Sequence, residues 1–340
     1  MKKIHIHDVS LRDGSHAISH QLSKEQIISY CIAANNAGIA TMEVGHGNGI
    51  GASSIQVGIS KLTDEEMLTI AKRNLTTTKL AIHVMPGFAT INKDLKKAFD
   101  WGVDLVRVAC HCTEADITEK HISFARERGK EAIGALMMTH MASKETLLEE
   151  ALKMQSYGAE GVVLYDSAGA YLPRDVKDKI NILVANLNIP VGFHAHNNLG
   201  LAIANSLAAV ECGAQIIDGA MRGFGAGAGN AQLEVLVAVL QKLEYETGIS
   251  LYKVMDAAEI TQEKIIQEIP TINNISIISG LSGVFSGFAK HVARIAKENE
   301  LDPRDIFIEL GKRKVVAGQE DLIVEVAIEL KKNISTTKSK

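Results

Sequence analysis

Long apolar runs are missing from this sequence of 340 residues, and Val235–Leu240, the longest, is far too short to cross a bilayer. The first residues carry two lysines with no apolar segment behind them, so we interpret Met1–His7 as the first strand and not as a secretion signal. Basic residues are not in excess either, because 36 lysines and arginines against 40 aspartates and glutamates give a net charge of −4. We therefore expect binding neither to nucleic acid nor to a membrane.

Cysteine is also scarce. The four cysteines have neither the spacing of a disulfide framework nor that of a zinc ribbon, so reduced thiols and a cytoplasmic location are expected. Apolar residues make up 46% of the chain and charged residues 22%, which is typical of a globular protein with a large core. The length fits one large barrel with an appended segment.

Short β-rich runs alternate with longer amphipathic stretches over residues 1–250. Helix starts are marked by capping residues such as Ser23 and Thr63, and helix ends by glycines such as Gly38. Eight such units predict an α/β fold, a TIM (β/α)8 barrel, with a doubly wound sheet as the less favoured alternative. The expected strands are Ile4–Val9, Thr41–Val44, Lys79–Met85, Leu105–Cys110, Ile133–Met138, Gly161–Tyr165, Pro190–His196 and Ile216–Met221.

The rhythm stops after the last expected barrel helix, Asn230–Thr247. Residues 251–335 are expected to form a helical C-terminal domain that packs on the barrel and contacts a partner. Its expected helices are Leu251–Glu268, Gly283–Asn299, Pro303–Leu310 and Gly318–Lys332.

The chemistry of a TIM barrel lies where the strands end. Asp13 follows the first strand, and His194 and His196 end the seventh. Alternate residues of a strand face the same way, so both imidazoles point into the barrel mouth, close to the strand that carries Asp13. Two imidazoles and one carboxylate with open positions suit an octahedral divalent ion that also takes up a chelating substrate.

Such an ion can act as a Lewis acid on a 2-oxo acid and stabilise the enolate left when a carbon–carbon bond breaks. Arg12 would add positive charge beside that enolate, and His16 is a candidate general base. The Arg12–Asp13 pair alone could equally be a surface ion pair of little worth. His5-x-His7 repeats the spacing of two histidines, but it starts a strand and is interpreted as structural.

Other strand-end residues leave their roles open. Glu43 and His140 either line the site or pack in ordinary barrel layers, and Asp166–Ser167 could give a supporting contact. The glycine-rich run Gly225–Asn230 is not a dinucleotide fingerprint, because its spacing differs and it follows the last strand. We interpret it as a tight lid or an anion-contacting turn.

These residues resemble the 4-hydroxy-2-oxovalerate aldolases, part of a metal-dependent group that includes the hydroxymethylglutaryl-CoA lyases and isopropylmalate synthases. The resemblance spans nearly the whole chain. It rests on Leu11–Ala17, His111–Asp116, His194–His196, Gly225–Ala231 and Gly318–Asp321.

The resemblance implies that Asp13, His194 and His196 bind Mn²⁺ (or Mg²⁺, Co²⁺ or Zn²⁺), that Arg12 stabilises the enolate and that His16 is the base. It also implies cleavage or formation of 4-hydroxy-2-oxo acids, with pyruvate and an aldehyde as the other side of the reaction. Family members pair with an acylating aldehyde dehydrogenase through the C-terminal segment, so a homo- or hetero-oligomer is expected.

The chain departs from the family pattern around the substrate. Phe285 stands where the family has tyrosine, which weakens stereochemical control, and His83 replaces a leucine of the aldehyde pocket. We expect Arg12, Ser167, His83, Met85 and Phe285 to contact substrate, with an aldehyde larger or more polar than acetaldehyde. The usual Gly-Gly pair is Ala317–Gly318, which weakens the expectation of an aldehyde channel.

Two alternatives stay open at this point. A Claisen-type synthase or lyase that joins an acyl-CoA to a 2-oxo acid shares the metal site, and release of thiol from acetyl-CoA would identify it. A non-catalytic scaffold for a dehydrogenase is the alternative of another class, which the intact set of polar residues argues against.

Overall fold

The chain folds into a closed barrel of eight parallel strands, in which each strand pairs with the next and β8 pairs back with β1. The computed structural model describes residues 2–266, 268–316 and 318–338, with side chains up to residue 333. The predicted TIM barrel is therefore confirmed, and the doubly wound alternative is wrong. The strands are β1 (His5–Leu11), β2 (Thr41–Val44), β3 (Lys79–Val84), β4 (Leu105–His111), β5 (Glu131–Met137), β6 (Val162–Asp166), β7 (Val191–Ala195) and β8 (Ile216–Gly219).

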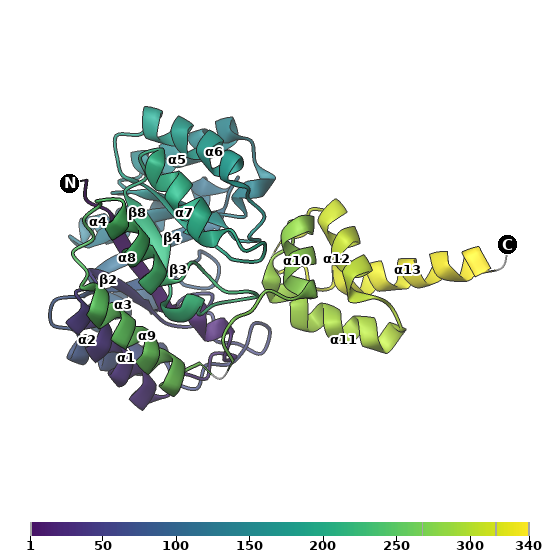
Figure 1. Cartoon of the computed structure of the whole chain (residues 1–340), viewed down its shortest axis with the longest axis horizontal. Coiled ribbons are helices and arrows are strands. Elements are labelled where there is room, and N and C mark those ends of the chain that lie inside the picture. The colour runs from purple at the N-terminus through teal and green to yellow at the C-terminus, as the bar shows by residue number, and fades with distance from the viewer. Residues whose placement is uncertain (1, 267, 317, 339–340) are drawn as a thin grey trace.

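Helices alternate with these strands and cover the outside of the barrel (Figure 1). Their starts follow the expected capping chemistry: the Ser23 hydroxyl accepts from the Gln26 N–H at 3.3 Å, and the Gln26 side chain accepts from the Ser23 N–H at 2.8 Å. The first helix ends at Gly38, whose φ of 87° lies in the left-handed region. The helices are α1 (Lys24–Ala37), α2 (Asp64–Asn74), α3 (Lys96–Asp100, preceded by a π-helical turn at Ile91–Leu95), α4 (Glu119–Glu127), α5 (Lys144–Ser156), α6 (Pro173–Asn186), α7 (Ala202–Glu211) and α8 (Leu233–Lys242).

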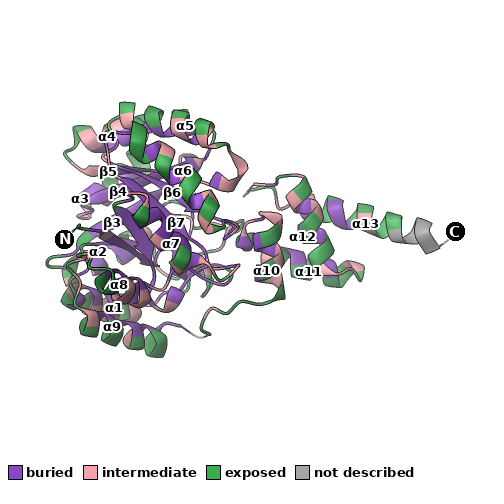
Figure 2. Ribbon diagram, turned by 45° about the horizontal axis from the view of Figure 1, so that its top comes forward, coloured by how far each residue is buried: buried purple, intermediate pink, exposed green. Residues whose placement is uncertain are grey.

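The barrel interior holds both apolar and charged side chains. Small and branched apolar side chains such as Ala109, Ala135 and Val163 form an inner cluster that fills part of it. Arg107 and Glu43, both fully buried, occupy another part, where aliphatic layers are usual. Figure 2 shows the strands almost entirely buried beneath the helices. Charged groups in so dry a place require partners, and those partners define the site described below.

A ninth helix, α9 (Leu251–Lys264), lies along α1 (Figure 1). Its Val254, Ala257 and Ala258 are buried in the same hydrophobic core as the barrel helices. The Gln26 side chain also donates to the Lys264 carbonyl at 2.8 Å. This helix therefore packs with the barrel, whereas the sequence had assigned it to the C-terminal domain.

The C-terminal lobe consists of four helices beside the barrel, with α13 reaching away from the rest (Figure 1). It has a core of its own, centred on Phe288, Val292 and Phe307. Among the described residues, no helix is long and apolar enough to span a membrane. The helices are α10 (Asn274–Ser282), α11 (Ala289–Asn299), α12 (Pro303–Lys312) and α13 (Leu322–Lys338).

Several expected helix boundaries were wrong. Helix α10 was missed, because its isoleucines, serines and glycine have low helix propensity and tertiary packing overrides that preference. Helix α11 begins at Ala289 and not at Gly283, since Gly283 has a φ of 68° and ends α10. Helix α8 ends at Lys242, and Glu244 follows with a φ of 60°.

Candidate metal centre and active site

Three side chains, from the ends of β1 and β7 on either side of β8, converge at the barrel mouth. Asp13 lies in a 3₁₀ turn (Asp13–His16) after β1, His194 lies in β7, and His196 follows β7 directly. One ligand atom from each lies within 4.8 Å of the others, and all three residues are buried. The structure thus brings together the three residues that the sequence proposed as metal ligands.

The donor chemistry of this trio fits a cation. His194 Nε2 and His196 Nε2 face each other at 3.3 Å. The other ring nitrogen of His194 lies 2.9 Å from an Asp218 carboxylate oxygen, which can only accept, so the proton of a neutral His194 belongs on Nδ1. A lone pair on His194 Nε2 therefore points at His196, in the arrangement that a bound cation would satisfy.

The carboxylates in and beside the trio have lowered pKa values, which also favours a bound cation. Burial alone would raise the pKa of Asp13, but the charges of His196, Arg12 and His194 outweigh burial and hold that pKa below its ordinary value. The pKa of Glu43 is likewise held low, because Arg12 and Arg107 outweigh its burial.

Asp218 is ionised for a similar reason, since Arg107 and His194 lower its pKa against the effect of burial. Three carboxylates, Asp13, Glu43 and Asp218, then face two guanidiniums in a buried region. The excess of one negative charge favours a bound cation.

Arg12 is fixed beside the trio from two sides. Its Nε donates to Glu43 Oε2 at 2.6 Å, and its Nη1 donates to Asp13 Oδ1 at 2.9 Å. Its Nη2 is buried and has no hydrogen-bond partner among the described residues, so one end of the guanidinium is available for a ligand. The surface ion-pair alternative is wrong, because both members are buried, and Glu43 lines the site by anchoring Arg12.

His16 stands at the edge of the site, half-buried, with its ring 6.3 Å from the ring of Phe285 and 5.0 Å from that of His20. Burial lowers the pKa of His16, although Asp13 acts in the opposite direction. Its imidazole is therefore neutral at neutral pH, the state that a general base needs.

Asn230 was not identified from the sequence. Its Nδ2 donates to Asp13 Oδ2 at 2.6 Å and to the Phe224 carbonyl at 3.0 Å. Its Oδ1 is buried and accepts no hydrogen bond from the part of the chain that the structure describes. Glycine is required just before it, because a Cβ on Gly229 would overlap the Gly223 carbonyl oxygen. The run interpreted as a tight lid or an anion-contacting turn is thus a loop that lies against the site, and its place after the last strand was the available signal.

The residues expected to contact substrate differ in how close they lie to the metal trio and in whether they are free to bind a ligand. Phe285 comes from the C-terminal lobe, yet its ring lies 6.5 Å from that of His196. His83 is buried in β3, where burial and then Arg12 lower its pKa to about 3. Its Nδ1 lies 4.0 Å from Glu43 Oε1 and has no hydrogen-bond partner within the described residues. Ser167 is already engaged, because its hydroxyl accepts from the Met138 N–H at 3.0 Å.

Two further features concern the remaining residues. Met85 follows β3 and packs against the inner cluster of the barrel. His5 and His7 both contact the Thr41 hydroxyl at 2.7 Å and lie outside the metal trio, in keeping with a structural role.

The C-terminal lobe is attached to the barrel mouth by hydrogen bonds. His140 Nε2 contacts the Gly283 carbonyl at 2.8 Å, and the Asn198 side chain donates to the Ser286 hydroxyl at 2.7 Å. These contacts hold the segment that carries Phe285 beside the site. His140 therefore attaches the C-terminal lobe to the barrel. The expectation of an aldehyde channel concerned Ala317–Gly318, and Ala317 lies outside the described residues.

Known proteins resemble this chain in both of its parts. Residues 3–261 match the HMGL-like family, and residues 270–332 match the DmpG-like communication domain. A 4-hydroxy-2-oxovalerate aldolase of Pectobacterium atrosepticum is 60% identical over 97% of this chain and 96% of its own length. A relative of the same name from Spirochaeta aurantia is 59% identical over 96% of both chains.

Solved structures agree on the fold. The HMG-CoA lyase of Bacillus subtilis superposes with a TM-score of 0.70 at 21% identity, covering 80% of this chain and 96% of the lyase. The carboxyl transferase domain of Rhizobium etli pyruvate carboxylase gives a TM-score of 0.81 at 15% identity, covering 98% of this chain and 61% of that one. Taken with the sequence relatives, the chain belongs to the 4-hydroxy-2-oxovalerate aldolases of the HMGL-like family and is a carbon–carbon lyase.

Proposed function

We propose that this chain is a divalent-metal aldolase that interconverts 4-hydroxy-2-oxo acids with pyruvate and an aldehyde through the pyruvate enolate. The observation that carries this is the convergence of Asp13, His194 and His196, with Arg12 fixed beside them and a neutral His16 at the edge. Two imidazoles and a carboxylate with open positions suit Mn²⁺, and Mg²⁺, Co²⁺ or Zn²⁺ can use the same ligands.

A cation held by the trio supplies Lewis-acid stabilisation of negative charge on the 2-oxo acid. Arg12 donates its unpaired N–H to the oxygen on which that charge develops. His16 accepts the proton of the C4 hydroxyl, the O–H electrons form the aldehyde C=O, and the C3–C4 bond breaks. The electron pair of the broken C3–C4 bond becomes the C2–C3 double bond of the enolate, and protonation of C3 then gives pyruvate.

We further propose that the aldehyde is larger or more polar than acetaldehyde. The buried Nδ1 of His83 makes no hydrogen bond to any residue that the structure describes, and a polar ligand group would satisfy it. Phe285 lacks a hydroxyl beside His16 and His196, which weakens discrimination at the carbinol carbon. A preference for 4-hydroxy-2-oxopentanoate over longer or more polar homologues, measured as kcat/KM, would contradict this part of the proposal.

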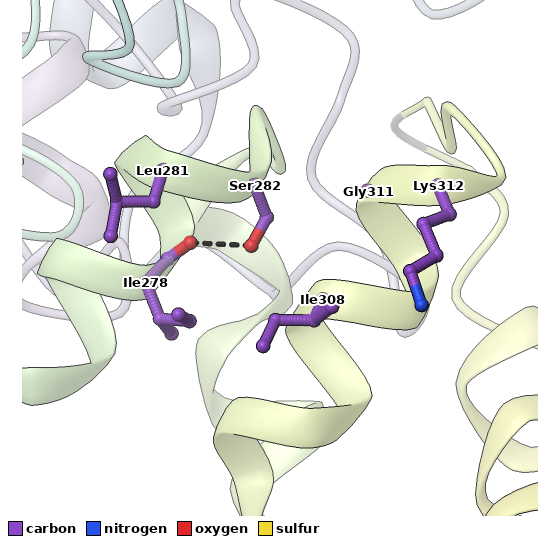
Figure 3. A pocket seen from close by; sticks show the side chains of 6 residues that line it. All are labelled: Ile278, Leu281, Ser282, Ile308, Gly311 and Lys312. Carbon is purple, nitrogen blue, oxygen red and sulfur yellow. Dashed lines mark hydrogen bonds between the residues drawn. The ribbon is translucent and has the colours of Figure 1, made fainter.

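The C-terminal lobe is the proposed docking surface for an acylating aldehyde dehydrogenase, with the division from the barrel between α9 and α10. Its match to a communication domain supports this, as does a groove of about 480 Å³ between α10 and α12 (Figure 3). Leu281 at its edge is 68% exposed, a large apolar side chain that a partner would cover. Leu281→Lys should abolish co-sedimentation with a purified acylating aldehyde dehydrogenase while pyruvate exchange is retained.

The experiment for the central proposal follows deuterium exchange into the methyl group of pyruvate by proton NMR. Chelator-treated protein should show little exchange, Mn²⁺ should restore it, and Asp13→Asn should lose it. The matched control is Asp8→Asn, a buried aspartate within β1, which accepts from Ser10 and Tyr30 instead. Absence of exchange from folded, Mn²⁺-loaded protein would contradict the pyruvate-enolate mechanism and direct the search to acetyl-CoA-dependent thiol release.

A further inference from the structure

An ion pair crosses the inside of the barrel behind the metal trio. Arg107 lies on β4 and Asp218 on β8, which are four strands apart in a closed ring of eight and therefore on opposite sides. Arg107 Nη1 donates to Asp218 Oδ2 and also contacts the Tyr165 hydroxyl at 3.1 Å. Both charged side chains are 1% exposed. Arg107 thus reaches across the barrel to Asp218, while its Nε lies 3.6 Å from Glu43 Oε1.

That carboxylate is in contact with a member of the trio. Asp218 Oδ2, the oxygen that accepts from Arg107, also accepts from His194 Nδ1 at 2.9 Å. The strand register explains the meeting, because Phe193 pairs with Ile217 and the next residues, His194 and Asp218, follow side by side. The Tyr165 ring stacks on the His194 ring at 4.5 Å between centroids. The hydrogen bond to Asp218 therefore fixes the His194 ring in its own plane, and the Tyr165 ring packs against its face.

We propose that Asp218, held by Arg107, is the positioning residue of the metal centre and sets the affinity of His194 for the cation. The inference rests on the proposed metal site. By accepting from Nδ1, Asp218 keeps the lone pair of His194 on Nε2, turned toward Asp13 and His196. Acceptors that hold the second nitrogen of a metal-binding histidine contribute about 10–100-fold to metal affinity.

A purely structural ion pair would behave differently. Breaking any buried pair destabilises the fold, so stability alone does not separate the two roles. Metal affinity does, because a pair that only supports the core leaves the affinity of folded protein unchanged.

The test compares two variants at Asp218 with the parent by calorimetric titration of chelator-treated protein with Mn²⁺. Asp218→Ala removes the acceptor and should weaken Mn²⁺ binding by about 100-fold, whereas Asp218→Asn keeps an acceptor oxygen without its charge and should weaken it by about 10-fold. Asp8→Asn is the control, a buried aspartate on neighbouring β1 that contacts Ser10 and Tyr30, and should leave Mn²⁺ affinity unchanged.

A second measurement covers the case in which Asp218→Ala fails to fold. Long-range ¹⁵N correlation spectra of the metal-free parent should show His194 protonated on Nδ1. In Asp218→Asn the two tautomers should be mixed, because an amide can turn either its oxygen or its NH2 group toward the imidazole. Folded Asp218→Asn with Mn²⁺ affinity within twofold of the parent, or His194 protonated on Nε2 in the parent, would overturn the inference. A parent that binds no Mn²⁺ would instead overturn the proposed metal site, so the two failures are distinguishable.

Discussion

Glu43→Gln removes a negative charge that two buried guanidiniums share. Glu43 Oε2 lies 2.6 Å from Arg12 Nε, and Glu43 Oε1 lies 3.6 Å from Arg107 Nε and 3.2 Å from His7 Nε2. The amide keeps the volume of the side chain, so the change isolates the charge. Removing one partner of a buried pair costs about 3–5 kcal/mol, because the remaining charge stays desolvated.

The expected loss can be converted to a melting temperature. A cooperative unit of roughly 260 residues has an unfolding entropy of roughly 0.55 kcal/mol per degree, so a loss of about 3–5 kcal/mol should lower the Tm by about 5–9 °C. Differential scanning calorimetry would measure the fall. The control is Asp178→Asn, which breaks the surface pair with Lys144, where Asp178 is 57% exposed, and should cost less than about 1 kcal/mol.

Glu43→Gln should also slow pyruvate exchange, since Arg12 loses its shorter anchor. A fall in Tm below about 2 °C, or one equal to that of Asp178→Asn, would refute the view that these guanidiniums depend on Glu43. It would mean that Asp13 and Asp218 alone neutralise them.

Three further predictions concern pH, the glycine-rich loop and stereochemistry. Burial lowers the pKa of His20 to about 3 and that of His46 to about 4, so the stability they contribute is complete above their ordinary value of 6.5 and is lost as pH falls toward 4. Burial raises the pKa of Asp8 and of Asp166 to about 6, and these two carboxyls oppose the effect of the histidines in part. The Tm should still fall between pH 6.5 and 4.5, and a constant Tm there would contradict the lowered pKa of His20 and His46. Gly229→Ala should lower Tm and Mn²⁺ affinity more than Gly248→Ala, because both have positive φ but only Gly229 meets a backbone oxygen; equal effects on calorimetry and titration would show that strain alone matters. Phe285→Tyr should raise the enantiomeric ratio of the aldol product on chiral chromatography, and an unchanged ratio would remove this residue from stereochemical control.

Much of the fold was determined locally. The eight strands were located from short β-rich runs, and the starts of α1 and α2 from Ser23 and Thr63, because capping and turn chemistry act over only a few residues. The metal trio was also predictable, since alternation along one strand puts His194 and His196 on one face and barrel closure brings Asp13 near. Local signals failed where propensity was weak, as in α10.

Tertiary structure decided how the site is supported. Arg107 and Asp218 lie 111 positions apart in the sequence, and Arg12 and Glu43 lie 31 apart, so no local sequence pattern predicts either ion pair. Asn230 reaches Asp13 only because the last loop returns to the first strand. A sequence shows which side chains can bind a metal or move a proton. Which charges share one dry interior, and so must neutralise each other, depends on closure of the barrel.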